Sequence, residues 1–228
     1  MKIAGINTNS FVDMKGMIAY VIFTAGCNLN CWYCHNRHII GDTPKLYNPD
    51  KVLSDIESRA GFIDIVVISG GEPTLQEDLI HFIKEIKKMD FRVKLDTNGT
   101  RPEVIEYLLT RNLIDYIAMD IKASKAKYPK TVCVDTDYAK ISRSIEVIMG
   151  SGIDYEFRTT FTSDLDERDI LEIAEEIQGA RLYVLQQFVP HDNMLKKVVG
   201  PHLPSYIKKT AEKADKYVKT IVRGLGVG

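Results

Sequence analysis

The feature that most constrains the fold is an alternation of short apolar runs with segments of helical periodicity along most of the chain. Apolar runs of strand length recur six times, and helix-like segments separate most of them. Such alternation indicates parallel strands joined by right-handed helical crossovers. Six units are fewer than the eight of a closed barrel, so the sequence predicts an α/β fold with an open, partial parallel β/α barrel. The expected strands cover residues 18–23, 63–69, 91–95, 116–119, 155–161 and 182–188.

Prolines and one capping residue mark several expected helix boundaries. Asn48 followed by Pro49 is typical of an N-cap and a first helical turn, and Pro102 marks another helix start. Residues 189–204 contain three prolines and predict an irregular connection. Beyond that connection, apolar residues at helical spacing predict an amphipathic helix over about 205–222.

Composition limits the class of protein. The chain has 228 residues, 45% of them hydrophobic, which suffices for one sizeable core. We expect one domain over residues 1–228, with a barrel core at about 15–190 and a C-terminal extension. The 30 basic and 31 acidic residues are mixed along the sequence, so no field of one sign favours nucleic acid. No run approaches the roughly 18 apolar residues that span a bilayer, and the first residues lack a signal-peptide core. A cytoplasmic protein without nucleic-acid or membrane partners is therefore expected.

Three of the four cysteines, Cys27, Cys31 and Cys34, are crowded into one short segment. Spacings of three and two residues let thiolates from one loop converge on an iron–sulfur cubane, whose four irons normally take four cysteines. The fourth iron is then open to a substrate or cofactor. A zinc site completed by His35 is the alternative, although a histidine directly after the last cysteine reaches the same ion poorly. Cys133 stands alone among β-branched residues and is expected to be a small buried side chain.

The spacing C-x3-C-x2-C, with aromatic Tyr33 before the last cysteine, resembles the signature of the radical S-adenosylmethionine (AdoMet) superfamily. The longer phrase over residues 23–36 is similar to the proteins that activate glycyl-radical enzymes. Among these it is most similar to anaerobic ribonucleotide reductase activating proteins, with pyruvate formate-lyase activases close behind. The resemblance implies a partial barrel, a [4Fe-4S] cluster on the three cysteines, and S-adenosyl-L-methionine on the open iron.

Polar residues follow the expected strands at the ends where parallel β/α folds bind ligands. Gly70 and Gly71 allow a ligand to approach the backbone, and the carboxylate of Glu72 can receive an ammonium group. A plain turn is the alternative reading. The resemblance implies that this motif binds the amino group of the methionine part of AdoMet. Three residues at the end of the next strand resemble those beside the ribose and carboxylate of the cofactor: Asp96, Thr97 and Asn98.

Charged and aromatic residues mark the later strand ends. Alternation points Asp120 and Lys122 to one side, either as a surface ion pair worth about 0–1 kcal/mol or, by resemblance, as the activase pair beside cofactor and target peptide. Arg158 lies among apolar residues, where a guanidinium needs an anionic partner, and the cofactor carboxylate is the expected one. Phe188 either packs on the adenine or belongs to the core. Tyr33 is expected to flank the adenine.

The resemblance also implies a reaction. AdoMet is cleaved reductively to methionine and a 5'-deoxyadenosyl radical, which takes a Cα hydrogen from a glycine. No segment resembles the glycyl-radical acceptor motif, so the partner is expected to be a separate glycyl-radical enzyme, first among them the large subunit of anaerobic ribonucleotide reductase. A low-potential donor such as flavodoxin or ferredoxin supplies the electron. Some activases hold a monovalent cation, and the matching positions here are Asp96, Thr97, Met119 and Asp120.

Two other functions stay open on the sequence alone. One is a radical AdoMet enzyme that acts on a small molecule or nucleoside. The other is a zinc-binding interaction protein without catalysis. Iron–sulfur loading under anaerobic conditions separates the second from the enzymatic readings.

Replacing Cys27, Cys31 or Cys34 by Ala is expected to abolish AdoMet cleavage, because each supplies one of only three thiolates to the cluster. Cys133→Ala is the control and is expected to leave cleavage largely intact. Iron content and release of 5'-deoxyadenosine are the two measurements. Loss of the cluster in the Cys133→Ala protein would contradict the assignment of ligands.

Overall fold

The computed structural model describes residues 1–41, 45–196 and 200–225. Within these residues, eight strands form one sheet in the order β1-β2-β3-β4-β5-β6-β7-β8. β1 is antiparallel to β2, and all later neighbours are parallel. The sheet is open, because β1 and β8 lie at its two edges. The predicted open, partial β/α barrel is confirmed.

The six expected strands are present, and two edge strands were not expected. β1 is a mixed polar and apolar segment, and β8 has only four residues, so neither shows a clear strand pattern in the sequence. The strands are β1 Ile3–Ser10, β2 Ala19–Thr24, β3 Ile65–Gly70, β4 Arg92–Thr97, β5 Tyr116–Asp120, β6 Asp154–Phe161, β7 Tyr183–Gln187 and β8 Thr220–Arg223.

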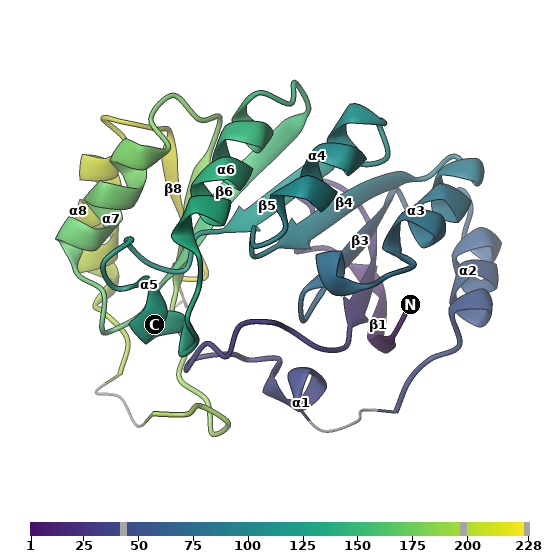
Figure 1. Ribbon diagram of the computed structural model, residues 1–228, viewed down its shortest axis with the longest axis horizontal. Coiled ribbons are helices and arrows are strands. Elements are labelled where there is room, and N and C mark those ends of the chain that lie inside the picture. The colour runs from purple at the N-terminus through teal and green to yellow at the C-terminus, as the bar shows by residue number, and fades with distance from the viewer. Residues whose placement is uncertain (42–44, 197–199, 226–228) are drawn as a thin grey trace.

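The larger helices form a layer along one face of the sheet, with α2 and α8 at opposite ends of that layer (Figure 1). Asn48 caps α2 as predicted, since its side chain accepts hydrogen bonds from the amides of Asp50 and Lys51. The helices are α1 Arg37–Ile40, α2 Pro49–Ser58, α3 Leu79–Lys88, α4 Pro102–Thr110, α5 Tyr128–Val132, α6 Tyr138–Met149, α7 Glu167–Glu176 and α8 Pro204–Ala214, with a short 3-10 helix η1 at Pro73–Leu75.

The predicted final helix over 205–222 is wrong in its second half. Helix α8 ends at Ala214, and the chain then turns into β8, where the Thr220 amide donates to Asp215 Oδ1 at 2.8 Å. The β-branched residues of β8 pair in parallel with β7, for example Ile221 with Val184. Pairing with a neighbouring strand therefore decides the conformation of this segment against its helical spacing. The described part of 189–204 that precedes α8 is irregular, as expected.

The two faces of the sheet differ in polarity. Residues that face the helices are mostly apolar and form the main core, including Ile22, Ile68, Leu95, Ile117 and Phe157. On the opposite, concave face, four apolar residues of β2 and β3 form a second cluster: Ala19, Val21, Ile65 and Val67. Alternation along β4, β5 and β6 places charged residues on the concave face: Lys94, Asp96, Asp120, Glu156 and Arg158.

The segment between β1 and β2 covers the apolar end of the concave face. Met14 and Met17 pack against its cluster, and the Lys94 ammonium donates to the Asp13 carbonyl at 2.6 Å. This segment joins the start of β2, so the opposite end of the barrel, where the parallel strands finish, is the end left for a ligand.

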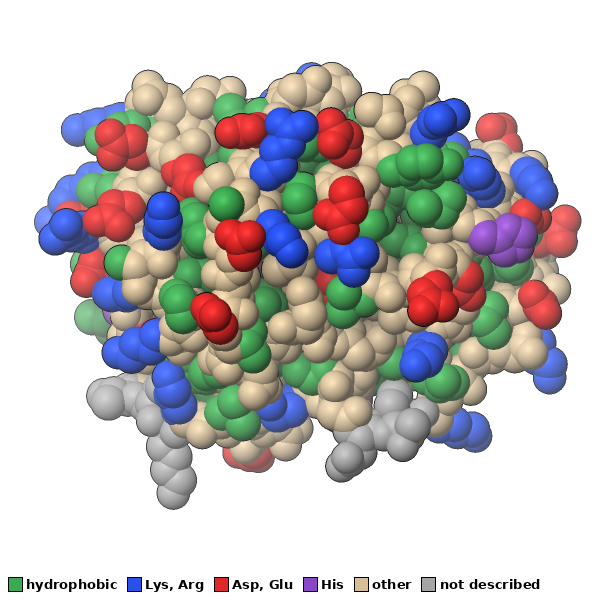
Figure 2. All heavy atoms as spheres, in the orientation of Figure 1, with side chains coloured by type: hydrophobic (Ala, Val, Ile, Leu, Met, Phe, Trp, Pro, Cys, Tyr) green, Lys and Arg blue, Asp and Glu red, His purple; other side chains and the backbone are tan. Residues whose placement is uncertain are grey.

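Charges are mixed on the surface as well. Acidic and basic side chains are interspersed over the helix-covered face (Figure 2). In the part of the chain that the structure describes, no helix has both the length and the apolar character needed to cross a membrane.

Candidate active site

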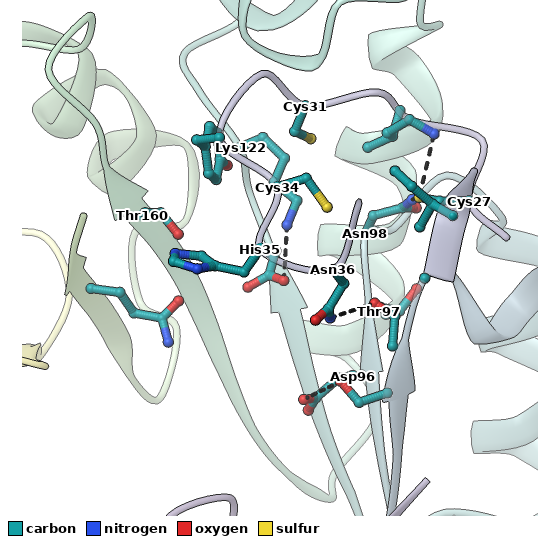
Figure 3. Close-up of a pocket in the computed structure, with 18 residues that line it drawn as sticks. Cys27, Cys31, Cys34, His35, Asn36, Asp96, Thr97, Asn98, Lys122 and Thr160 are labelled. Atoms are coloured by element: carbon teal, nitrogen blue, oxygen red, sulfur yellow. Dashed lines mark hydrogen bonds and ion pairs between the residues drawn. The ribbon is translucent and has the colours of Figure 1, made fainter. Parts of the chain in front are cut away.

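A cavity of about 270 Å³ lies where the parallel strands finish. Its wall combines the cysteine loop with the ends of β3, β4 and β5, and the three cysteine side chains surround one space with Asn98 and Lys122 (Figure 3). Most of the residues predicted from the sequence line it: Cys27, Cys31, Tyr33, Cys34, Gly70, Gly71, Asp96, Thr97, Asn98, Asp120 and Lys122. Glu72, Arg158 and Phe188 are not part of the wall. The sequence analysis missed other lining residues: Leu29, His35, Asn36, Ile40, Ser69, Thr160 and Gln186.

Backbone hydrogen bonds attach the cysteine loop to the end of β3. The amide of Gly71 donates to the carbonyl of Thr24, and the amide of Glu72 donates to the carbonyl of Gly26, each at 2.9 Å. Cys27 is the residue after Gly26, so its position is fixed by the sheet.

Both glycines are required by this attachment. A Cβ on Gly71 would lie 1.9 Å from the carbonyl oxygen of Gly26, and one on Gly70 would lie 2.3 Å from the amide nitrogen of Thr24. Gly70 also has a φ of 113°, in the region that favours glycine. The predicted close approach is therefore present, but the approaching group is the protein's own backbone.

A side chain that the sequence analysis missed braces the middle of the loop. Arg37 donates from Nη1 to Asn30 Oδ1 and from Nη2 to the Cys31 carbonyl, both at 2.8 Å. On the other side, the Asn30 amide donates to the Val132 carbonyl at 3.0 Å. The only signal in the sequence is a basic residue soon after the last cysteine.

Cys133, next to Val132, is half-buried at the left-handed C-cap of α5, so the expectation of a buried side chain is wrong.

Cys31 is buried, and Cys27 and Cys34 are partly buried. Burial raises the pKa of the Cys27 thiol to about 11 and that of Cys31 to about 12. Among the residues that the structure describes, no three Cys, His, Asp or Glu side chains converge as a single metal ion requires. A cubane binds each cysteine to a different iron, so it accepts ligands that are further apart.

A buried ion-pair network borders the cavity, with Arg158 at its centre. Its Nε donates to Asp120 Oδ1 at 2.8 Å and its Nη1 to Asp96 Oδ2 at 3.3 Å. Lys122 donates to the other Asp120 oxygen at 3.0 Å. Burial opposes ionisation of Asp120, but Arg158 and Lys122 outweigh it and hold the pKa of this carboxyl well below its usual range. The anionic partners that Arg158 requires are thus supplied by the protein.

The same network occupies two of the residues expected to hold a monovalent cation. The guanidinium of Arg158 already bridges Asp96 and Asp120, the two carboxylates expected to hold a monovalent cation. The donor set does not fit a further cation in this arrangement. Asp96 Oδ1 lies 3.4 Å from the Lys94 ammonium as an ion pair, yet it accepts no hydrogen bond within the described residues.

Glu72 lies behind the cavity wall and is fully buried. Its Oε1 accepts from the Thr74 amide and hydroxyl and from the Thr97 hydroxyl, and its Oε2 accepts from the Asn98 amide at 2.7 Å. Burial raises the pKa of this carboxyl. The carboxylate expected to receive an ammonium group instead joins the end of β3 to the end of β4.

Aromatic residues support the loop from the core side. Phe188 is fully buried and packs edge-on against Trp32, with ring centroids 5.4 Å apart, and against Tyr33 at 6.4 Å. Of its two expected places, the structure shows the core. Tyr33 lines the cavity, and its buried hydroxyl has no hydrogen-bond partner among the described residues.

Comparison with known proteins shows the superfamily to which the chain belongs. A family model for the radical SAM superfamily matches residues 21–177, and the chain belongs to this superfamily. Its members use a [4Fe-4S] cluster and S-adenosylmethionine. The chain is 37% identical to a protein of Methanocaldococcus jannaschii that carries the provisional name glycyl-radical enzyme activating enzyme, over 96% of this chain and 94% of that one.

One further relative and one solved structure extend the comparison. A probable GTP 3',8-cyclase of Methanococcus vannielii is 28% identical, covering 76% of this chain and 59% of its own. The fold is similar to that of Streptococcus suis SuiB bound to S-adenosylmethionine, with a TM-score of 0.71 and 15% identity over 90% of this chain and 50% of that one. At this identity the last match concerns the fold alone.

Gly71→Ala is expected to abolish cluster binding, because its Cβ would push the Gly26 backbone and the cysteine loop away from β3. Iron content after anaerobic reconstitution is the measurement. Gly150→Ala is the matched control, since its nearest neighbour atom would be 3.5 Å away and its φ is −83°. A Gly71→Ala protein with full iron content would refute this account of the loop.

Asp120→Asn is expected to lower the free energy of unfolding at pH 7 by about 3 kcal/mol, because it leaves Arg158 and Lys122 without their shared charge. The pKa of Asp120 is lowered in the folded protein, so its contribution is present above the unfolded value of 3.8 and is lost as pH falls below it. The difference between wild type and variant should therefore shrink toward acid. Urea unfolding at several pH values measures it, and equal stability at pH 7 would contradict the prediction.

Proposed function

We propose that this chain is a glycyl-radical activating enzyme, which binds a [4Fe-4S] cluster and AdoMet and abstracts a Cα hydrogen from a glycine of a separate enzyme. The observation that carries the proposal is that Cys27, Cys31 and Cys34 line the same cavity as the ends of β3, β4 and β5. Three cysteines leave one iron of a cubane without a protein ligand. The match to the Methanocaldococcus jannaschii protein over nearly the whole of both chains supports the substrate class.

The cavity wall fits a cofactor that carries amino, carboxylate and hydroxyl groups. Asp96 Oδ1 and the Tyr33 hydroxyl are buried without hydrogen-bond partners among the described residues, and a bound polar molecule satisfies such atoms. The ion-pair network has one more cation than carboxylates, which favours an added carboxylate nearby. Its cations are Lys94, Lys122, Arg158 and Arg223, and its carboxylates are Asp96, Asp120 and Glu156.

When bound, the reduced cluster supplies one electron and AdoMet supplies the group that abstracts hydrogen. The protein orients the cofactor and limits water. We assign the flank of the adenine to Tyr33, the ribose and carboxylate side to Asp96 and Thr97, and the side near the target glycine to Asp120 and Lys122. Gly70 and Gly71 line the cavity on the side that we assign to the amino group, while Glu72, Arg158 and Phe188 act from behind the wall.

The partner is proposed to be the large subunit of anaerobic ribonucleotide reductase. The open sheet, with β1 and β8 unpaired at their outer edges in the described structure, suits a macromolecular substrate better than a cavity closed on all sides. A flavodoxin or ferredoxin is the proposed electron donor. Ordering of a partner loop costs entropy, so a transient complex is expected.

A second candidate is a radical AdoMet enzyme that acts on a nucleotide. Similarity to the Methanococcus vannielii cyclase over three quarters of this chain favours it. The two candidates share the cluster and the cofactor, so only the fate of the radical separates them.

The test is to reconstitute the protein anaerobically, reduce it, and incubate it with AdoMet and the reductase large subunit. A glycyl-radical doublet in the electron paramagnetic resonance spectrum is expected, and it should be absent when Cys34→Ala protein is used. Release of 5'-deoxyadenosine without a doublet, for this and other glycyl-radical enzymes, would favour the nucleotide candidate. Failure to bind iron would overturn both.

A further inference from the structure

Cys27 differs from the other two cysteines in the donors around its sulfur. The Leu29 amide lies 3.4 Å from its Sγ, and the Asn98 side-chain nitrogen lies 3.8 Å from the same atom. In the described parts of the chain, no such donor contacts the sulfur of Cys31 or Cys34. We propose that Asn98 is a positioning residue that sets the reduction potential of the cluster through its hydrogen bond to Cys27. This inference rests on the proposed cluster.

The orientation of the Asn98 amide follows from its neighbours. The Thr100 backbone N–H can only donate, and it lies 3.0 Å from Asn98 Oδ1, so the oxygen must face it. The amide nitrogen therefore points the other way, toward Cys27 and Asn28. One of its hydrogens bonds to Asn28 Oδ1 at 3.0 Å, which leaves the second for the sulfur.

A closed ring of hydrogen bonds holds this orientation. The Thr100 hydroxyl donates to Asn98 Oδ1 at 2.7 Å and accepts from Asn28 Nδ2 at 2.8 Å, and Asn98 returns a hydrogen bond to Asn28. Each of the three side chains donates one hydrogen bond within the ring and accepts another, so a reversed Asn98 amide would break several bonds at once.

The ring is anchored on the sheet as well as on the cysteine loop. Asn98 follows the last residue of β4, its backbone amide donates to the buried carboxylate of Glu72 at 2.7 Å, and its side chain is buried. Figure 3 shows it beside Cys27 at the edge of the cavity. The donor is thus held at the sulfur by an element separate from the loop that carries the cysteine.

Hydrogen bonds to the sulfurs of a cluster are among the factors that set its potential. Reduction adds negative charge to the cluster, and a donor at a coordinating sulfur stabilises that charge. Asn98 therefore raises the potential, which widens the range of donors able to reduce the cluster. Among the described residues, such donors contact the sulfur of Cys27 and not those of Cys31 and Cys34, so the effect acts through one of the three ligands.

The test compares the midpoint potential of the AdoMet-free cluster in wild type, Asn98→Asp and Asn98→Leu, by redox titration followed with electron paramagnetic resonance. Both variants are expected to titrate at a more negative potential at equal iron content, and Asp further than Leu because it adds negative charge. Ser144→Ala is the matched control. It removes a 2.6 Å hydrogen bond to the Gly99 carbonyl in the same turn but leaves the Asn98 amide, so the wild-type potential is expected.

Unchanged potentials in both Asn98 variants, or an equal shift in Ser144→Ala, would overturn the assignment. A second measurement needs no variant. When asparagine is labelled with ¹⁵N in the side-chain amide, pulsed electron paramagnetic resonance of the reduced wild-type cluster should show a coupling between the cluster spin and ¹⁵N. Its absence would also overturn the inference. A wild-type protein that holds no cluster would instead refute the proposed function on which the inference rests.

Discussion

The hydrogen bonding between the ends of β2 and β3 determines where the cysteine loop lies. The two strands pair in parallel up to Thr24 and Gly70, and the amides of Gly71 and Glu72 continue the contact to Thr24 and Gly26. This extension requires backbones so close that a Cβ on Gly71 has no room. The first cysteine comes directly after the contact. The cysteine loop is therefore placed by the sheet, with Arg37 bracing its middle.

The charged part of the concave face is costly to build. Buried ion pairs recover much of the loss of hydration only when every charge is matched, and apolar replacements of similar size are often more stable. Here Arg158 lies between Asp96 and Asp120 from neighbouring strands, while β2 and β3 supply no charged residue to the same face. The charges are thus concentrated at the strands that line the cavity. Binding of a charged molecule explains that concentration better than stability does.

Much of this architecture follows from the sequence, because strands buried on both faces and helices with one apolar face leave strong patterns. The features that the sequence does not predict have physical causes. β8 has β-branched residues at a spacing that also fits a helix, and only its pairing with β7 decides between them. The sequence around Arg158 predicts an anionic partner for its guanidinium. It does not predict the register between β5 and β6 that places Asp120 opposite Arg158. The ring around Asn98 depends on contacts between segments far apart in the sequence and leaves no local signal. The contacts of Arg37 stay within the cysteine loop, and their only signal is a basic residue soon after the last cysteine.

Glu72 shows how one motif serves two neighbours. Its backbone amide bonds to Gly26 in the segment before Cys27, whereas its carboxylate bonds to Thr97 and Asn98 at the end of β4. A carboxylate at a strand end next to two glycines suggests a ligand site and predicts that the side chain points into the cavity. In the structure, the carboxylate of Glu72 lies behind the cavity wall instead. With four hydrogen bonds inside the protein, the carboxylate has little capacity left for a cofactor. It instead fixes the loop and the β4 end relative to each other, so the distance between Cys27 and Asn98 is set by the same residue that closes the wall behind them.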